Sequence, residues 1–148
     1  MESDSADSHG EFGDWVIVKA ENDDQVAIFR VRTDEPSDMS VCTENVCISW
    51  PYQGDDHGFP SKADGEAMAM FEDAIADLTG TPEFSQLVLV VTGFDVREWH
   101  FYVADYSVFM AELNALLQRS PKLPLEIVHT PDPGWSIWRT VRDRAVTQ

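Results

Sequence analysis

Several short stretches of the chain alternate hydrophobic with polar residues, which is the pattern of strands that bury one face. Two of them, Asp14 to Ala20 and Val26 to Thr33, are rich in β-branched and aromatic residues. Only the five residues from Glu21 to Gln25 separate these two stretches. The pattern therefore predicts an N-terminal hairpin with a five-residue loop.

A helical period replaces this alternation in two segments. Ser61, followed three residues later by Asp64, has the form of a capping box and predicts a helix that runs to about Leu78. Asp105 can cap a second helix, whose inward residues recur every three or four positions. These residues are Phe109, Leu113, Leu116 and Leu117.

Four further strands are predicted around the two helices: Val46 to Trp50, Leu87 to Thr92, Val96 to Val103 and Leu125 to His129. From Val46 onward the order is strand, helix, strand, strand, helix, strand. This is the order of the ferredoxin-like fold, also called split βαβ or βαββαβ. We therefore expect an α+β fold, with an antiparallel sheet and two helices on one face.

The chain of 148 residues has the length of a single domain. Residues 1–13 are acidic and polar, and we expect them to form a disordered tail. A single α+β domain is predicted over residues 14–141. It comprises the hairpin, residues 14–33, and the ferredoxin-like unit, residues 46–130; residues 142–148 are expected to form a C-terminal tail.

One predicted strand is apolar on both of its faces. Strict alternation places Leu87, Leu89 and Val91 on one face, and Val88 and Val90 on the other. An apolar strand of this kind implies that both faces of the sheet are covered. We expect the helices to cover one face, and either the N-terminal hairpin or a second subunit to cover the other.

The next strand carries the most compact set of acid and base side chains. Glu98, His100 and Tyr102 alternate with apolar residues and so share one face. Neighbours on one strand face lie about 7 Å apart, so the three can share a ligand as acid, base and hydrogen-bond donor. Arg97 can supply a charge for an anionic group nearby. A structural polar network or an interface rim explains the same residues, and no nucleophile is adjacent in sequence.

Two other groups offer binding chemistry. Asp55, Asp56 and His57 supply oxygen and imidazole ligands for a cation, but no second His or known metal-binding spacing accompanies them. We therefore predict neither a metal nor a cofactor. Trp135 and Trp138 follow a Pro-Gly turn, and they form either an aromatic clamp for a partner or a cap on the open end of the core.

The two cysteines, Cys42 and Cys47, have no partner cluster of His and no Cys-x-x-Cys spacing. We predict buried thiols rather than a disulfide, which fits a reducing cytoplasm. The N-terminus has no signal peptide pattern, and no segment approaches the roughly 18 apolar residues of a membrane span. A cytoplasmic protein is expected.

The charge balance excludes several partners. Against 10 Lys and Arg stand 27 Asp and Glu, which gives a formal net charge of -17. A field of this sign repels phosphate backbones and anionic lipids, so we expect no direct nucleic-acid binding and no membrane binding. Glycine-rich phosphate loops and the Gly-x-Ser-x-Gly elbow are absent from the sequence.

Several short motifs follow one another along the chain: Gly58-Phe59-Pro60, Thr92-Gly93, Arg97-Glu98, Phe101-Tyr102 and Asp132-Pro133-Gly134-Trp135. In this order they resemble an uncharacterised bacterial family called domain of unknown function 695, over nearly all of Asp14 to Val141. The resemblance supports the predicted fold, and the family has no established catalytic residues to carry over. That family is similar in turn to regulator of ribonuclease activity B, an acidic ferredoxin-like protein that inhibits an RNA-degrading enzyme by binding it.

These observations favour a non-enzymatic binding or regulatory domain whose acidic surface engages a basic partner protein. The alternative is a small-molecule sensor or enzyme with its site at Glu98, His100 and Tyr102. A third hypothesis is a homodimer formed through the second face of the sheet.

Overall fold

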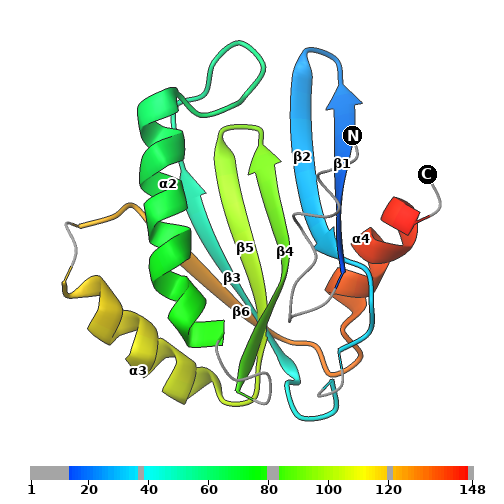
Figure 1. Ribbon diagram of the computed structural model, residues 1–148, viewed down its shortest axis with the longest axis vertical. Coiled ribbons are helices and arrows are strands. Elements are labelled where there is room, and N and C mark those ends of the chain that lie inside the picture. The colour runs from blue at the N-terminus through cyan, green and yellow to red at the C-terminus, as the bar shows by residue number, and fades with distance from the viewer. Residues whose placement is uncertain (1–13, 37–38, 80–83, 120–121, 147–148) are drawn as a thin grey trace.

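The computed structural model describes residues 14–36, 39–79, 84–119 and 122–146. Its elements follow one another as β1 (Trp15–Asn22), β2 (Gln25–Arg32), β3 (Glu44–Pro51), α2 (Lys62–Ile75), the 3₁₀ helix η1 (Ala76–Thr79), β4 (Ser85–Gly93), β5 (Val96–Val103), α3 (Tyr106–Leu117), β6 (Glu126–Pro131) and α4 (Ser136–Val146). Figure 1 shows these strands assembled beside the helices. The predicted mixture of helices and an antiparallel sheet is confirmed.

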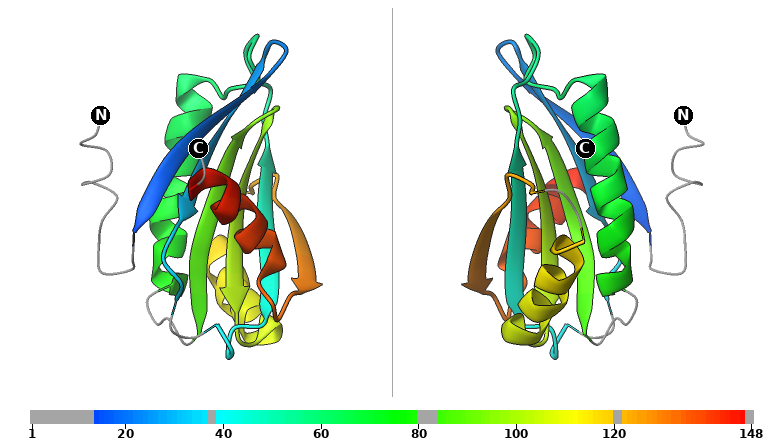
Figure 2. Two further views of the ribbon diagram at one scale, coloured as in Figure 1. Left: turned by 90° about the vertical axis from the view of Figure 1, so that its right-hand side faces the viewer. Right: turned by 90° about the vertical axis from the view of Figure 1, so that its left-hand side faces the viewer.

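The sheet has six strands in the order β1-β2-β4-β5-β3-β6, and all neighbouring strands are antiparallel. Helices α2 and α3 cover one face of this sheet, and α4 crosses the other face (Figure 2). The strand β5 lies inside the sheet between β4 and β3, so residues on both of its faces are positioned by two neighbours.

The N-terminal hairpin forms with a shorter loop than predicted. Asn22 pairs with Gln25, so only Asp23 and Asp24 connect the two strands. Asp23 has φ 57°, a left-handed conformation that aspartate adopts more readily than most residues. This tight turn, rather than a five-residue loop, joins β1 to β2. The hairpin extends the edge of the sheet next to β4 and does not fold over its second face.

Both predicted helix starts are confirmed by their caps. The Ser61 hydroxyl accepts a hydrogen bond from the Asp64 backbone N–H at 3.1 Å. The Asp105 carboxylate accepts one from the Val108 backbone N–H at 3.0 Å. Each cap satisfies a donor that the first helical turn leaves without an internal partner. The first helix, predicted to run to about Leu78, ends as an α-helix at Ile75 and continues as the 3₁₀ helix η1.

The first core lies between the sheet and the helices α2 and α3. Trp99, Phe101 and Val103 of β5 are fully buried there. The Phe71 ring of α2 meets Trp99 edge to face with centroids 5.0 Å apart. The alternation predicted for β5 therefore places its apolar residues under the helices, as expected from the sequence.

Strand β4 departs from strict alternation because it contains a β-bulge. Its register against β5 shifts between Leu87 and Leu89, so Val88 is the extra residue. Consequently Leu87 packs in the first core, whereas Val88 and Leu89 both lie in the core on the opposite face. The prediction that Leu87, Leu89 and Val91 share one face is wrong for Leu87, and the prediction that Val88 and Val90 share the other face is wrong for Val88.

Helix α4 covers the second face of the sheet, a role that we expected the hairpin or a second subunit to fill. Its Trp138 and the preceding Trp135 are fully buried in a second core with Val31 of β2 and Leu89 of β4. Residues 142–146, expected to be part of a tail, belong to this helix. Both faces of the sheet are therefore covered within one chain.

We predict that Trp138→Ala lowers the free energy of unfolding by about 3–5 kcal/mol, because it empties a fully buried indole site. Val146→Ala on the same helix is a matched control, since Val146 is 57% exposed and its truncation should change stability by less than about 0.5 kcal/mol. Urea denaturation of both variants measures the difference. Equal stabilities would contradict the packing of α4 on the sheet.

Candidate functional site

Strand β5 places the three predicted polar residues on the face opposite α2 and α3, but the structure divides them. Tyr102 lies in the second core beneath Trp135 and is fully buried. Glu98 and His100 lie further along β5, toward the β4–β5 turn, with side chains 36% and 13% exposed. The three residues therefore occupy two separate environments, one buried and one partly exposed.

Tyr102 belongs to a buried network at the start of α4. Its hydroxyl donates a hydrogen bond of 2.6 Å to the Asp132 carboxylate. The same carboxylate accepts hydrogen bonds from the backbone N–H groups of Ser136 and Ile137 at 2.9 and 3.0 Å. Asp132 thus caps α4 while it holds the tyrosine. These contacts occupy the polar atoms that a ligand would need.

The pKa values of this pair follow from the network. Burial and the adjacent Asp132 carboxylate raise the pKa of the Tyr102 hydroxyl, so it remains a donor. Burial acts to raise the pKa of Asp132, but hydrogen bonds from Tyr102, Ile137 and Ser136 outweigh it and lower that pKa below 3.8. Asp132 is therefore ionised at neutral pH, and Tyr102 is neutral.

The two tryptophans fill the second core instead of facing solvent. Trp135 stacks on Tyr102 with ring centroids 4.0 Å apart and an interplanar angle of 8°. Its indole N–H donates to the Cys42 carbonyl at 2.7 Å, and the Trp138 indole N–H donates to the Arg32 carbonyl at 2.9 Å. Of the two roles considered from the sequence, this geometry matches the cap on the core.

Arg97 does not join the other predicted site residues. It precedes Glu98 on β5 and so points to the opposite face of the sheet. Its guanidinium donates a hydrogen bond of 2.8 Å to the Thr92 hydroxyl. Burial lowers the pKa of Arg97, and the charge of Glu72 opposes this effect. Arg97 therefore cannot share a small ligand with Glu98 and His100 across the sheet.

A buried thiol that no sequence motif singled out lies beside Glu98 and His100. Cys47 of β3 lies directly opposite His100 of β5. Its Sγ lies 3.6 Å from His100 Nε2, and the Glu98 Oε1 lies 3.1 Å from the same nitrogen. The three potential ligand atoms lie within 4.8 Å of one another. We call these residues the Cys47–Glu98–His100 cluster.

Charge within this cluster is balanced by close contacts. Burial acts to lower the pKa of His100, but the hydrogen bonds with Cys47 and Glu98 raise it to about 9. The hydrogen bond with His100 in turn lowers the pKa of Glu98. A charged imidazole therefore faces a carboxylate at neutral pH. Among the described residues, nothing bonds the buried Nδ1 of His100.

The loop residues Asp55, Asp56 and His57 are exposed and do not converge in this way. The Asp55 carboxylate accepts backbone hydrogen bonds from His57 and Phe59 at 2.9 and 3.0 Å. The His57 Nδ1 lies 3.0 Å from the Asp24 carbonyl. These contacts organise the loop. Within the described ranges, converging metal ligands are found instead in the Cys47–Glu98–His100 cluster.

An apolar cavity of about 420 Å³ lies elsewhere, between α3 and the segment that leads into β6. Leu113, Leu117, Leu123, Leu125 and Ile127 contribute to its apolar lining. None of the predicted site residues borders this cavity.

In its described part, the chain is an α+β protein with a buried tyrosine network and a partly buried cluster of thiol, imidazole and carboxylate. A family model described as "Family of unknown function (DUF695)" matches residues 13–141, so the chain belongs to this family. No curated protein and no solved structure matches the chain. In the described part of the chain, no helix is both long and apolar enough to span a membrane.

We predict that Tyr102→Phe lowers the free energy of unfolding at neutral pH by about 1.5–3 kcal/mol, the usual loss for a hydrogen bond to a charged group. The pKa of folded Asp132 lies below its unfolded value, so its contribution is present above about pH 3.8 and is lost as the pH falls through the folded pKa. Tyr102→Phe removes one of the hydrogen bonds that lower the pKa of Asp132, and so reduces this pH-dependent contribution to stability.

The difference in stability between wild type and Tyr102→Phe should therefore shrink as the pH falls below about 3.8. Urea denaturation at several pH values measures it. A difference that stays constant over this range would show that the hydroxyl does not act through the Asp132 charge.

Proposed function

We propose that this protein is a non-enzymatic binding domain that engages a basic partner protein through an acidic surface at one end of its sheet. The observation that carries this proposal is the gathering of exposed carboxylates from three separate loops and the adjoining end of β1. They are Glu21, Asp23, Asp24, Asp55, Asp56 and Asp95, and we call them the acidic end.

Backbone hydrogen bonds hold these loops together. The Val26 N–H donates to the His57 carbonyl at 3.2 Å, which joins the β1–β2 turn to the loop after β3. The Asp95 N–H donates to the Gly58 carbonyl at 3.1 Å, which joins that loop to the β4–β5 turn. Because the loops are already in place, a partner would not have to order them on binding, which lowers the cost of association.

Two glycines permit this close packing. Gly93 has φ 153°, and a Cβ at this position would lie 2.6 Å from the Val26 carbonyl oxygen. Gly58 has φ 85°, and its Cβ would lie 2.9 Å from the Phe94 nitrogen. A side chain at either position would push the loops apart, so the arrangement of the carboxylates depends on both glycines.

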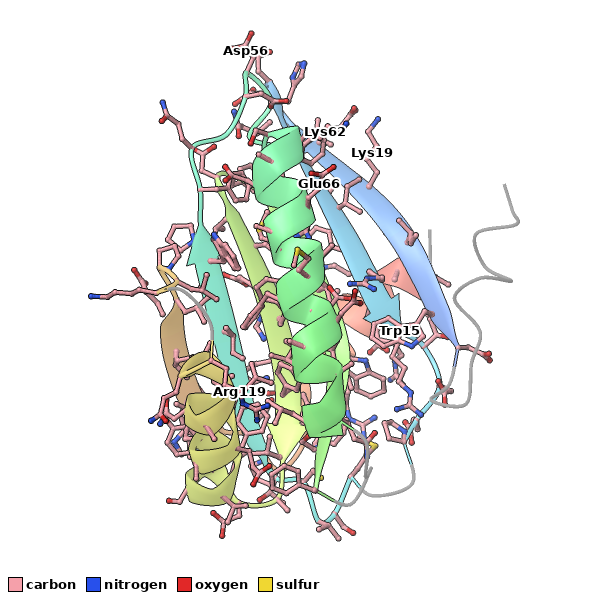
Figure 3. All side chains as sticks on the ribbon, turned by 60° about the vertical axis from the view of Figure 1, so that its left-hand side comes forward. Trp15, Lys19, Asp56, Lys62, Glu66 and Arg119 are labelled. Carbon is pink, nitrogen blue, oxygen red and sulfur yellow. The ribbon has the colours of Figure 1, made fainter. Side chains whose placement is uncertain are left out.

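Few basic groups offset the charge of the acidic end. Lys19 lies 3.5 Å from Glu21 and is thereby paired. Figure 3 shows Lys19, Lys62 and Asp56 toward the same end of the molecule. The hydrogen bond with Asp24 and the surrounding carboxylates raise the pKa of His57 above 6.5. The carboxylates still outnumber these groups, which favours a cationic partner.

The alternative, a sensor or enzyme at Glu98, His100 and Tyr102, is less well supported. Its three residues do not share one accessible pocket, since Tyr102 is buried and its hydroxyl is bonded to Asp132. Acid-base catalysis by this trio would require the second core to open. The homodimer hypothesis is also weakened, because it requires an apolar second face of the sheet, and α4 covers apolar surface on that face.

A ferredoxin-like origin is consistent with the binding proposal. The order β4-β5-β3-β6, with α2 and α3 on one face, supports assigning residues 46–130 to that arrangement. The hairpin β1–β2 and α4 are additions to it. A relationship with regulator of ribonuclease activity B, a bacterial origin and a cytoplasmic location are parts of this proposal. They agree with an acidic protein that acts by binding another protein.

Neutralising part of the acidic end tests this function. The variant Asp24→Asn, Asp56→Asn, Asp95→Asn should weaken capture of a basic protein partner from lysate about 10-fold or more, since each exposed charge contributes up to about 1 kcal/mol. Raising the salt concentration should weaken capture by the wild type in the same way. Quantitative mass spectrometry of the captured proteins, with cross-links mapped to residues, provides the measurement.

A matched control removes the same number of charges elsewhere on the surface. Asp73→Asn, Glu112→Gln, Glu126→Gln changes exposed residues of α2, α3 and β6. Capture should persist in this control. Equal losses in the two variants, or no partner captured by the wild type at low salt, would refute the acidic end as the binding surface.

A further inference from the structure

We propose that Cys47, Glu98 and His100 form a zinc-binding site on the second face of the sheet. This proposal concerns a different surface from the acidic end and does not rest on partner binding. It starts from the convergence of a thiol, an imidazole nitrogen and a carboxylate oxygen on one point, with all three atoms within 4.8 Å of one another.

Two of the separations between these atoms are close to those of ligands around one zinc ion. Zinc bonds of about 2.0–2.3 Å at tetrahedral angles place neighbouring ligand atoms roughly 3.3–3.6 Å apart. Here Cys47 Sγ lies 3.6 Å from His100 Nε2, and Glu98 Oε1 lies 3.1 Å from the same nitrogen. An ion bound here would lie next to His100 Nε2, with Cys47 Sγ and Glu98 Oε1 converging on it from within 4.8 Å of each other.

The ligand types select the metal. Thiolate and imidazole are the ligands that zinc prefers, whereas magnesium and calcium take oxygen ligands. On binding, the Cys47 thiol and the protonated imidazole each release a proton to solvent. The charges of the thiolate and the Glu98 carboxylate then balance the two charges of Zn²⁺. A neutral assembly of this kind reduces the cost of holding the ion in a partly buried site.

The backbone positions the ligands before any ion arrives. Cys47 and His100 are paired residues of two adjacent interior strands, and Glu98 follows His100 on the same face at a spacing of two. The Glu98 side chain is 36% exposed, so an ion can enter from its side. Three protein ligands leave the fourth zinc position to water, as in sites that remain open to solvent.

Groups around the ligands also bear on the affinity. The Ser49 hydroxyl lies 3.7 Å from Cys47 Sγ and can support a thiolate. The Nδ1 of His100 has no bonding partner in the described part of the chain. Zinc-binding histidines usually donate this second N–H to an acceptor, and losing that acceptor costs about 10–100-fold in affinity. We therefore expect a reversible site rather than a permanent structural one.

Titration of the metal-free, reduced protein with Zn²⁺ by calorimetry tests the site, and Co²⁺ serves as a spectroscopic probe. We expect one reversibly bound equivalent and a sulfur-to-cobalt charge-transfer band. Cys47→Ala should abolish this band and weaken zinc binding at least about 10-fold, and Glu98→Gln should also weaken binding. Because Glu98 is partly exposed, its variant keeps the test valid if Cys47→Ala is poorly folded.

Three control variants separate this site from other candidates. Cys42→Ala removes the other buried thiol, Glu112→Gln removes an exposed carboxylate of α3, and His57→Gln removes the loop imidazole. All three should bind zinc like the wild type. The acidic-end variant should do so too, which keeps this result independent of the proposed function. No zinc binding by the wild type, or unchanged binding in Cys47→Ala, would overturn the proposal.

Discussion

The hydrogen bond between Tyr102 and Asp132 connects the middle of the sheet to the start of α4, and the arrangement of the second face depends on it. Asp132 also caps α4, so one carboxylate fixes where the helix begins and which strand it contacts. With that end fixed, Trp135 lies flat on Tyr102, and Trp138 reaches β2. A buried carboxylate without these donors would be costly, so the network and the helix stabilise each other.

This placement of α4 determines what β5 can offer to solvent. The helix covers Tyr102, whereas Glu98 and His100 remain partly exposed. The row of polar residues on β5 is therefore split into a neutral buried donor and an accessible ion pair. The alternation along β5 places Tyr102, His100 and Glu98 on the same face. The path of the C-terminal segment makes Tyr102 a structural residue and leaves the other two as candidate ligands.

The parts of the fold that could be predicted from the sequence are those with local physical causes. Ser61 and Asp105 cap helices through donors three residues away, and the alternation along β5 assigns each side chain to a face. The bulge at Val88 gave no such signal. Leu87, Val88 and Leu89 are all apolar, so no alternation with polar residues shows which of them faces which side of the sheet.

Contacts between distant parts of the chain escaped prediction for a different reason. Asp132 caps α4 across a Pro-Gly turn, through donors four and five residues away, which is not the usual capping spacing. Cys47 lies 53 residues before His100, and only the pairing of β3 with β5 brings them together. The expected trio was therefore incomplete, since one of its members was buried and the nearest thiol was on another strand.

The acidic end and the Cys47–Glu98–His100 cluster are close enough for a charge at one to affect the electrostatic potential at the other. Arg30, Arg32, Arg139 and Arg142 all have carboxylate partners, so these cations do not neutralise the acidic end. Glu98 is three positions after Asp95, about 10 Å along an extended chain, which is close to the Debye length at physiological salt. A change of charge at the Cys47–Glu98–His100 cluster would therefore be felt at the acidic end.

No such change is expected when zinc binds. Without zinc, the protonated His100 balances the Glu98 carboxylate. With zinc, the ion balances a thiolate and a carboxylate beside a neutral imidazole. Both states have no net charge, so the acidic end keeps its field whether or not the ion is present. An effect of zinc on partner binding would then have to come from a movement of β3 and β5 and not from charge.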